Sequence, residues 1–214
     1  HELKTPLAAL NIYNGLLQEG TADPAEVRQF AALSEQELDR MERLVQNLLK
    51  LARLDADAVQ FEKAEENVSE MMQELSQSFA LRAEQEGKTL VFSGEEGVTL
   101  CCDRVWLLEA FRNLVKNALD HTTAGDTVTV EWCQFASIVQ VKVSDTGAGI
   151  HPEDLPHLFK RFYRSRFAEE VQGVGLGLPL AKAIVEAHRG TIEVDSALGQ
   201  GTKFVLNFRT PTKL

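Results

Sequence analysis

Apolar side chains at the beginning of the chain recur at the spacing of an amphipathic helix. At about 100° per residue, four leucines share one narrow stripe: Leu3, Leu7, Leu10 and Leu17. The pattern predicts a first helix that ends near Glu19, with Gly20 as a left-handed cap. His1 and Thr5 fall on the opposite face, where we expect both side chains to point to water.

A second helix is predicted from Asp23 to about Leu54. Asp23 supplies a capping side chain, Pro24 suits the first helical position, and Glu26 stands three residues after the cap. Its apolar positions recur every three or four residues, among them Val27, Phe30, Met41, Val45 and Leu48. Two helices alone cannot bury apolar faces of this size, so we expect a homodimer that forms a four-helix bundle.

The remainder of the chain alternates between strand and helix patterns. Residues 127–132 and 138–143 alternate between apolar and polar side chains, as a half-buried antiparallel sheet requires. Further strands are predicted at 88–92, 99–102, 191–194 and 203–208, and helices at 68–86, 103–121 and 178–188. The fold class is therefore α+β, a two-layer α/β sandwich with a mixed, largely antiparallel sheet. The predicted divisions are a helical hairpin at 1–57, a linker at 58–66 and the sandwich domain at 67–214.

Composition narrows the possible partners. The 32 acidic residues outnumber the 22 Lys and Arg, and the net charge of -10 has the wrong sign for binding nucleic acid or an anionic membrane.

Three cysteines form neither a metal-binding spacing nor an even disulfide set, and we expect them to be buried strand residues in a reducing cytosol. No apolar run approaches the roughly 18 residues that span a bilayer. Because the chain starts at His, we expect a fragment whose membrane attachment would lie upstream.

Five short motifs follow one another along the chain. They are His-Glu-Leu-Lys-Thr-Pro at 1–6, Asn-Leu-Val-Lys-Asn at 113–117, Asp-Thr-Gly-Ala-Gly at 145–149, Phe-Lys-Arg-Phe at 159–162 and Gly-Val-Gly-Leu-Gly-Leu at 173–178. In this order they resemble the cytoplasmic core of a sensor histidine kinase from a two-component system. The resemblance covers nearly the whole chain.

The first motif carries an exposed imidazole. A neutral ring nitrogen is a nucleophile near pH 7, and Glu2 is the nearest group that would fix its tautomer. The resemblance implies that His1 accepts a phosphoryl group, that Glu2 orients or deprotonates it, and that Thr5 positions water for dephosphorylation. Taken alone, His1 would be an ordinary surface histidine.

The helix predicted at 103–121 has a polar flank opposite its apolar stripe. Asn113, Asn117 and Asp120 share this flank, and Mg²⁺ prefers such oxygen ligands together with ATP phosphates. The resemblance assigns Mg²⁺ to Asn117, with Asn113 in support and Lys116 beside them at the nucleotide. At 120 and 121 the family commonly has a basic residue and an aromatic one, and His121 would partly replace the aromatic. A solvated helix face is the ordinary alternative.

Asp145 ends a predicted strand, and we expect Gly147 and Gly149 to let the backbone approach a flat ligand. A carboxylate at this place can accept from the exocyclic amine of adenine, whereas guanine presents a carbonyl at the same edge. The resemblance makes Asp145 the adenine-binding residue and adds Ile150 to the pocket. As an isolated motif, Asp-Thr-Gly is more often a simple turn.

The segment 164–172 resembles the mobile lid over ATP. Phe159 and Phe162 would anchor its start, and Arg164 matches the basic residue that contacts phosphate. The glycine-rich motif precedes a helix, whose free N–H groups can receive phosphates; its members are Gly173, Val174, Gly175, Leu176, Gly177 and Leu178. By resemblance, Thr202 lines the adenine pocket. The motif is neither a P-loop, which needs Gly-Lys-Ser/Thr, nor a Rossmann loop, which needs a third glycine at 178.

The resemblance implies an ATP-dependent protein-histidine kinase that phosphorylates His1 and passes the phosphoryl group to an Asp on a response regulator, with regulator phosphatase activity as a further property. ATP and Mg²⁺ are the expected cofactors, and the chain would be the cytoplasmic part of a bacterial membrane sensor. Two alternatives are a non-catalytic ATP-binding dimerisation module and a chaperone-like ATPase. The intact His1, Glu2, Asn117 and Asp145 argue against the first, and the second does not explain Glu2 and Thr5 around an exposed His1. An enzyme that works mainly as a phosphatase is compatible with every one of these residues.

Overall fold

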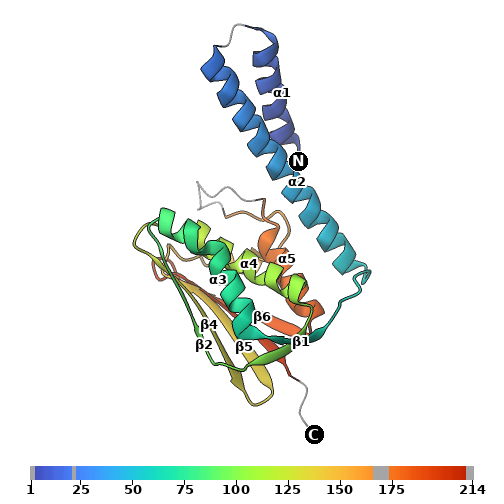
Figure 1. Ribbon diagram of the computed structural model, residues 1–214, viewed down its shortest axis with the longest axis vertical. Helices are drawn as coiled ribbons and strands as arrows, with labels where there is room; N and C mark the ends of the chain where they lie inside the picture. Colours follow the sequence, from blue (N-terminus) through green and yellow to red (C-terminus); the bar gives the residue numbers. More distant parts are fainter. Residues whose placement is uncertain (1–2, 21–22, 166–173, 211–214) are drawn as a thin grey trace. The chain divides into compact units, whose positions relative to one another are not determined.

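The computed structural model describes residues 3–20, 23–165 and 174–210 (Figure 1). The chain forms two compact units, His1–Ala52 and Arg53–Leu214. The predicted boundaries of the hairpin at 1–57, the linker at 58–66 and the sandwich domain at 67–214 stay predictions. None of the described helices is long and apolar enough to cross a membrane.

The first unit is the predicted hairpin, built from α1 (Lys4–Gln18) and most of α2 (Pro24–Asp55). The capping box at the start of α2 is confirmed, because Asp23 Oδ1 accepts from the N–H of Glu26 at 2.9 Å while Glu26 Oε2 accepts from the N–H of Asp23 at 2.8 Å. The rings of Tyr13 and Phe30 stack between the two helices at 6.1 Å.

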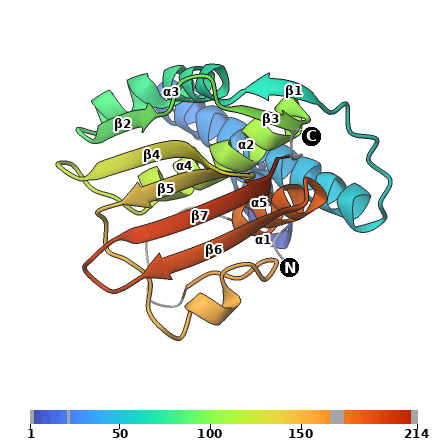
Figure 2. The ribbon, with the colours of Figure 1, turned by 90° about the horizontal axis from the view of Figure 1, so that it is seen from below.

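The second unit is a two-layer α+β sandwich, as predicted. Its main sheet has the strand order β2-β4-β5-β7-β6, in which β2 and β4 run parallel and every other pair is antiparallel. Figure 2 shows this sheet with the helices behind it. The strands are β2 (Thr89–Gly94), β4 (Thr127–Phe135), β5 (Ile138–Asp145), β6 (Gly190–Ser196) and β7 (Thr202–Arg209).

The core of this unit lies between the sheet and three helices, α3 (Val68–Gln85), α4 (Arg104–Asp120) and α5 (Gly177–Ala187). The apolar stripe predicted for α4 is buried: Leu107, Phe111, Leu114 and Ala118. It meets side chains of the sheet, including the ring of Phe208, which lies edge-on to that of Phe111 at 6.4 Å.

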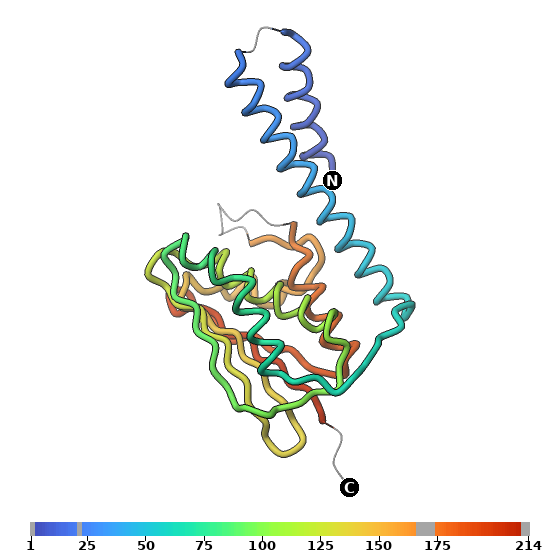
Figure 3. The backbone as a smooth tube through the Cα atoms, in the orientation of Figure 1, coloured from blue at the N-terminus to red at the C-terminus, as the bar shows by residue number. Residues whose placement is uncertain are grey.

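Three local features differ from the sequence-based expectations. Strand β1 (Ala64–Asn67) begins in the predicted linker and ends at the first residue of the predicted sandwich domain. It pairs with β3 (Thr99–Cys102) in a separate two-stranded sheet. A 3-10 helix, η1 (Leu155–His157), lies on the path from β5 to α5 (Figure 3). Of the three cysteines expected to be buried, only Cys102 is buried, whereas Cys133 is half-buried and Cys101 is exposed. The side chains of β3 alternate, so that Cys102 points inward and Cys101 outward.

Candidate functional site

Helix α4 places its two asparagines on the predicted flank, where both are half-buried. Asp103 caps the helix by accepting from the N–H of Trp106 at 3.2 Å. The amide nitrogen of Asn113 donates to the carbonyl of Glu109 at 2.9 Å, which leaves its amide oxygen facing the start of α5. A hydrogen bond within α4 therefore sets the orientation of the Asn113 amide.

The residues at the end of α4 enter a charged network. Asp120 accepts from Arg82 on α3 at 2.8 Å through Oδ1 and from Lys116 at 2.5 Å through Oδ2. Arg82 also donates to Glu86 at 2.7 Å. Asp120 thus ties α4 to α3 through Arg82, whereas Lys116 pairs with Asp120 within α4. His121 follows as the exposed helix cap.

Asp145 ends β5 directly opposite Thr202, which begins β7. It is 8% exposed, and its Oδ1 accepts from the N–H of Gly147 at 3.0 Å and from the N–H of Thr202 at 3.2 Å. Burial raises the pKa of the Asp145 carboxyl above its ordinary value, and the two backbone hydrogen bonds oppose this rise by stabilising the charged form. The carboxylate is held in one orientation at the end of the sheet.

The reason for the glycine at 147 differs from the one expected. A Cβ on Gly147 would lie 2.2 Å from the carbonyl oxygen of His121, so the glycine allows two protein loops to approach, whether or not a ligand is near. This contact brings the end of α4 next to the loop after Asp145. Ile150, at the end of that loop, donates its N–H to Ser196 Oγ at 2.9 Å.

The aromatic residues before α5 have distinct surroundings. The ring of Phe159 packs edge-on against Phe204 at 6.4 Å and lies under the Lys182 ammonium at 5.1 Å. Phe162 is 43% exposed and has a φ of 61°, which is rare for an aromatic residue. Its N–H donates to the carbonyl of Gly175 at 2.9 Å. Arg164 is exposed.

Helix α5 begins at Gly177, directly after buried Leu176. Val174 and Leu178 are half-buried on either side. His1, Glu2, Gly173 and most of the segment 164–172 lie outside the described residues, whereas Thr5 is exposed on α1.

Ser196 is a residue of this site that sequence reasoning missed. Its hydroxyl donates to the carbonyl of Gly201 at 2.8 Å while it accepts from Ile150, so it joins the loop after Asp145 to the turn before Thr202. A serine at a strand end carries no signal of such a role, because both partners are backbone groups and Ile150 lies 46 positions away in the sequence.

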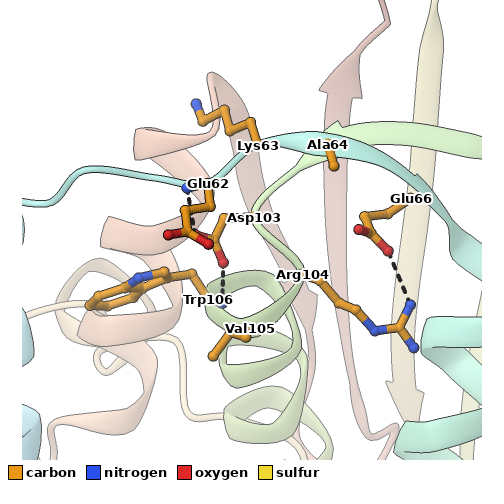
Figure 4. A pocket seen from close by; sticks show the side chains of 8 residues that line it. All are labelled: Glu62, Lys63, Ala64, Glu66, Asp103, Arg104, Val105 and Trp106. Atoms are coloured by element: carbon orange, nitrogen blue, oxygen red, sulfur yellow. Dashed lines mark hydrogen bonds and ion pairs between the residues drawn. The ribbon is translucent and has the colours of Figure 1, made fainter.

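An open hollow of about 520 Å³ lies elsewhere, at the start of α4 (Figure 4). It is lined by Glu62, Lys63, Ala64, Glu66, Asp103, Arg104, Val105 and Trp106. Its polar groups already pair with one another: Arg104 with Glu66 at 3.2 Å, and the N–H of Glu62 with Asp103 at 2.9 Å. No residue predicted to bind nucleotide lines it, so the candidate site is the one around Asn117 and Asp145.

Two family models match the chain. The model of the histidine kinase-, DNA gyrase B- and HSP90-like ATPases matches residues 102–212, which include α4, Asp145 and α5. The model of the His kinase A phospho-acceptor domain matches residues 1–57. The chain belongs to the sensor histidine kinases.

Relatives of this histidine kinase chain agree with that assignment. It is 33% identical over 220 residues to the sensor protein SrrB of Staphylococcus aureus, covering 99% of this chain but 37% of SrrB. The chain thus spans little more than a third of the length of the curated relative. Full-length ShkA, solved in complex with AMPPNP, is 26% identical with a TM-score of 0.75, covering 100% of this chain and 45% of ShkA.

The histidine kinase ThkA, solved in complex with the response regulator protein TrrA, shares the fold. Its TM-score is 0.81 at 20% identity, over 99% of this chain and 60% of ThkA. The hairpin followed by an α/β sandwich is therefore the architecture of known histidine kinases.

Proposed function

We propose that this chain is an ATP-dependent protein-histidine kinase. The γ-phosphoryl group of ATP passes to His1, and from there to an Asp on the receiver domain of a response regulator. The observation that carries the proposal is the fixed, buried carboxylate of Asp145 at the end of the sheet, within the segment that matches the ATPase family.

Asp145 would select adenine. Both hydrogen bonds that the described residues give its carboxylate end on Oδ1, from Gly147 and Thr202. Oδ2 is then the acceptor for the exocyclic amine of adenine. Guanine would present a carbonyl oxygen to the same carboxylate, and this repulsion disfavours GTP. His121 and Ile150 would border the base.

The phosphates would lie toward the start of α5. The first N–H groups of a helix have no intrahelical acceptor and attract anions, and α5 begins with Gly177, which leaves the backbone accessible. Arg164, exposed before this helix, would add a positive charge to the γ-phosphate.

The residues of α4 fit a magnesium ion. Mg²⁺ takes hard oxygen ligands, and Asn113 already has its amide nitrogen bonded to Glu109, so that its oxygen faces the start of α5. Asn117, one turn further, would supply the ligand oxygen, with Asn113 supporting the phosphates. When bound, Mg²⁺ neutralises charge on the phosphates.

The transfer itself would occur at His1. The bond between the γ-phosphorus and its bridging oxygen breaks, a nitrogen–phosphorus bond forms at the imidazole, and ADP leaves. Glu2 would take the ring proton, and Thr5 would orient water in a later dephosphorylation of the regulator. The match of residues 1–57 to the phospho-acceptor family supports this assignment.

A homodimer would bring two hairpins together. Four apolar side chains of α2 are exposed and fall within about 40° of one another around the helix axis: Val27, Leu38, Val45 and Leu49. Such a stripe on a two-helix unit is the face that a second copy would cover. We also propose that the chain is the cytoplasmic part of a membrane sensor; its similarity to the sensor protein SrrB supports the sensory role.

The test is incubation with γ-labelled ATP of a protein that carries further residues before His1. We expect label that is stable to alkali and labile to acid, and its loss in His1→Ala with ATP affinity nearly unchanged. Label that persists on one of the four other histidines would refute the assignment of His1. Subsequent loss of label to candidate response regulators would identify the partner.

A further inference from the structure

The path from the loop after Asp145 to α5 contains a series of tight turns between His151 and Tyr163. The backbone N–H groups of Asp154, His157, Lys160 and Tyr163 each donate to the carbonyl three residues earlier, at 2.9, 2.8, 2.9 and 3.2 Å. With about three residues per turn, side chains three apart lie over one another. Asp154, His157 and Tyr163 consequently share one side of this segment.

A partly buried hydrogen bond joins two of these side chains. The Tyr163 hydroxyl donates to Oδ1 of Asp154 at 2.6 Å, and the Tyr163 ring packs against His157 with centroids 5.3 Å apart. Asp154 is only 2% exposed. Burial disfavours its charged form, but hydrogen bonds from Ser165 and Tyr163 and the nearby histidines hold the pKa of Asp154 below its ordinary value. A charged acceptor makes this a strong bond.

Tyr163 in turn fixes the segment before α5. Gly175 has a φ of 70°, and a Cβ there would lie 2.5 Å from the carbonyl oxygen of Tyr163. The neighbouring N–H of Phe162 donates to the carbonyl of Gly175 at 2.9 Å. The backbone around Tyr163 and the glycine-rich start of α5 therefore lie directly against each other.

Both groups that would hold phosphate adjoin this contact. Arg164 is the next residue after Tyr163, and Gly177 is two residues after Gly175 and faces the amide oxygen of Asn113. The Asp154–Tyr163 bond involves neither Arg164 nor Gly177. Tyr163 nevertheless adjoins both stretches of backbone, because Arg164 follows it directly and Gly175 lies against its carbonyl.

We propose that Asp154 and Tyr163 are a positioning pair that holds Arg164 and the start of α5 in place for the phosphates of ATP. The inference rests on the proposed function, because it concerns the same nucleotide site. The pair acts on phosphate binding and leaves the adenine contacts of Asp145 untouched.

The test compares ATP with adenosine, using calorimetric titration and competition on the whole chain. Tyr163→Phe removes only the hydroxyl and keeps the ring contact with His157. We expect it to weaken ATP binding about tenfold, because the segment that carries Arg164 must then be ordered when the phosphates bind. Adenosine binding should change by less than about twofold.

Two further variants separate the hydrogen bond from packing. Asp154→Asn keeps an acceptor oxygen and should affect ATP less than Asp154→Ala does. The double variant Tyr163→Phe/Asp154→Ala should bind ATP as tightly as whichever single variant binds it less tightly, because both changes remove the same bond. Tyr13→Phe removes the hydroxyl of the other tyrosine, on α1, and serves as the matched control with unchanged binding.

Three results would overturn the inference: unchanged ATP affinity in Tyr163→Phe, equal losses for ATP and adenosine, or additive losses in the double variant. If the unmutated chain binds no ATP, the proposed function fails, and the positioning role fails with it. Retained ATP binding with no effect of the variants would refute the positioning role alone.

Discussion

The amide oxygen of Asn113 on α4 faces Gly177 at the start of α5 so closely that a methyl group on Gly177 would lie 2.9 Å from it. The two helices therefore meet through a polar atom of the candidate site and a residue without a side chain. Gly177 has a helical position, so alanine would suit its backbone.

The first prediction concerns this contact. Gly177→Ala should displace the Asn113 amide, the flexible end of a side chain, and so weaken Mg²⁺-dependent ATP binding by about tenfold or 1.4 kcal/mol. Thermal unfolding should change little. Asn113→Ala should lower affinity in the same way without any steric clash. Normal affinity in Gly177→Ala, with a lowered melting temperature, would mean that the contact serves packing alone.

The second prediction concerns adenine selection. In Asp145→Asn the side-chain oxygen can still accept from Gly147 and Thr202, so the fold should persist. The second position becomes an N–H₂ donor facing the adenine amine. The loss of a charged acceptor, about 1–3 kcal/mol, should weaken ATP binding at least about tenfold and reduce the preference over GTP. Equal ATP and GTP affinities in the unmutated chain would contradict this role.

The third prediction concerns dephosphorylation. Thr5 is exposed on α1 and follows His1 by four positions in the sequence. Thr5→Ala should leave autophosphorylation intact and slow the dephosphorylation of the regulator about tenfold, equivalent to about 1.4 kcal/mol of barrier. Both rates are measured with labelled phosphate on the same preparation. A parallel loss of kinase activity would show that Thr5 supports the acceptor geometry instead.

The fourth prediction concerns pH. Nε2 of His188 accepts from the N–H of Asp103 at 3.1 Å, and its Nδ1 lies 2.8 Å from the Ile184 carbonyl, so the neutral ring carries its proton on Nδ1. Burial lowers the pKa of His188, a backbone hydrogen bond to Ile184 opposes this, and the charges of Lys63 and Asp103 act in opposite directions. A protonated ring would lose its bond from Asp103.

Because the unfolded chain binds this proton near pH 6.5 and the folded chain only at lower pH, the free energy of unfolding should fall as the pH drops below about 6.5. Urea unfolding between pH 8 and pH 5 measures this. His188→Gln keeps an acceptor but does not titrate. In this variant the free energy of unfolding should fall less between pH 8 and pH 5 than it does in the unmutated chain. Identical pH dependence in both proteins would exclude His188 as the titrating group.

Periodicity predicted most of the second unit because its helices and strands bury one face each. Strand β1 escaped prediction because its sequence, Ala-Glu-Glu-Asn, has no apolar alternation and is held by pairing with β3. The pairing of Asp120 with Arg82 was equally invisible, since it joins residues 38 positions apart. Motif order singled out Asp145, but its orientation also depends on the N–H of Thr202, which only the register of β5 and β7 brings near.

Asp145 and Thr202 are opposite partners on neighbouring strands although 57 positions separate them. Closing a loop of that length costs about 3–4 kcal/mol of chain entropy, which the pairing of β5 with β7 must offset. During synthesis β5 emerges well before β7, and until the last strand joins the sheet the carboxylate lacks the N–H of Thr202. The proposed adenine acceptor is therefore complete only when β7 is in place.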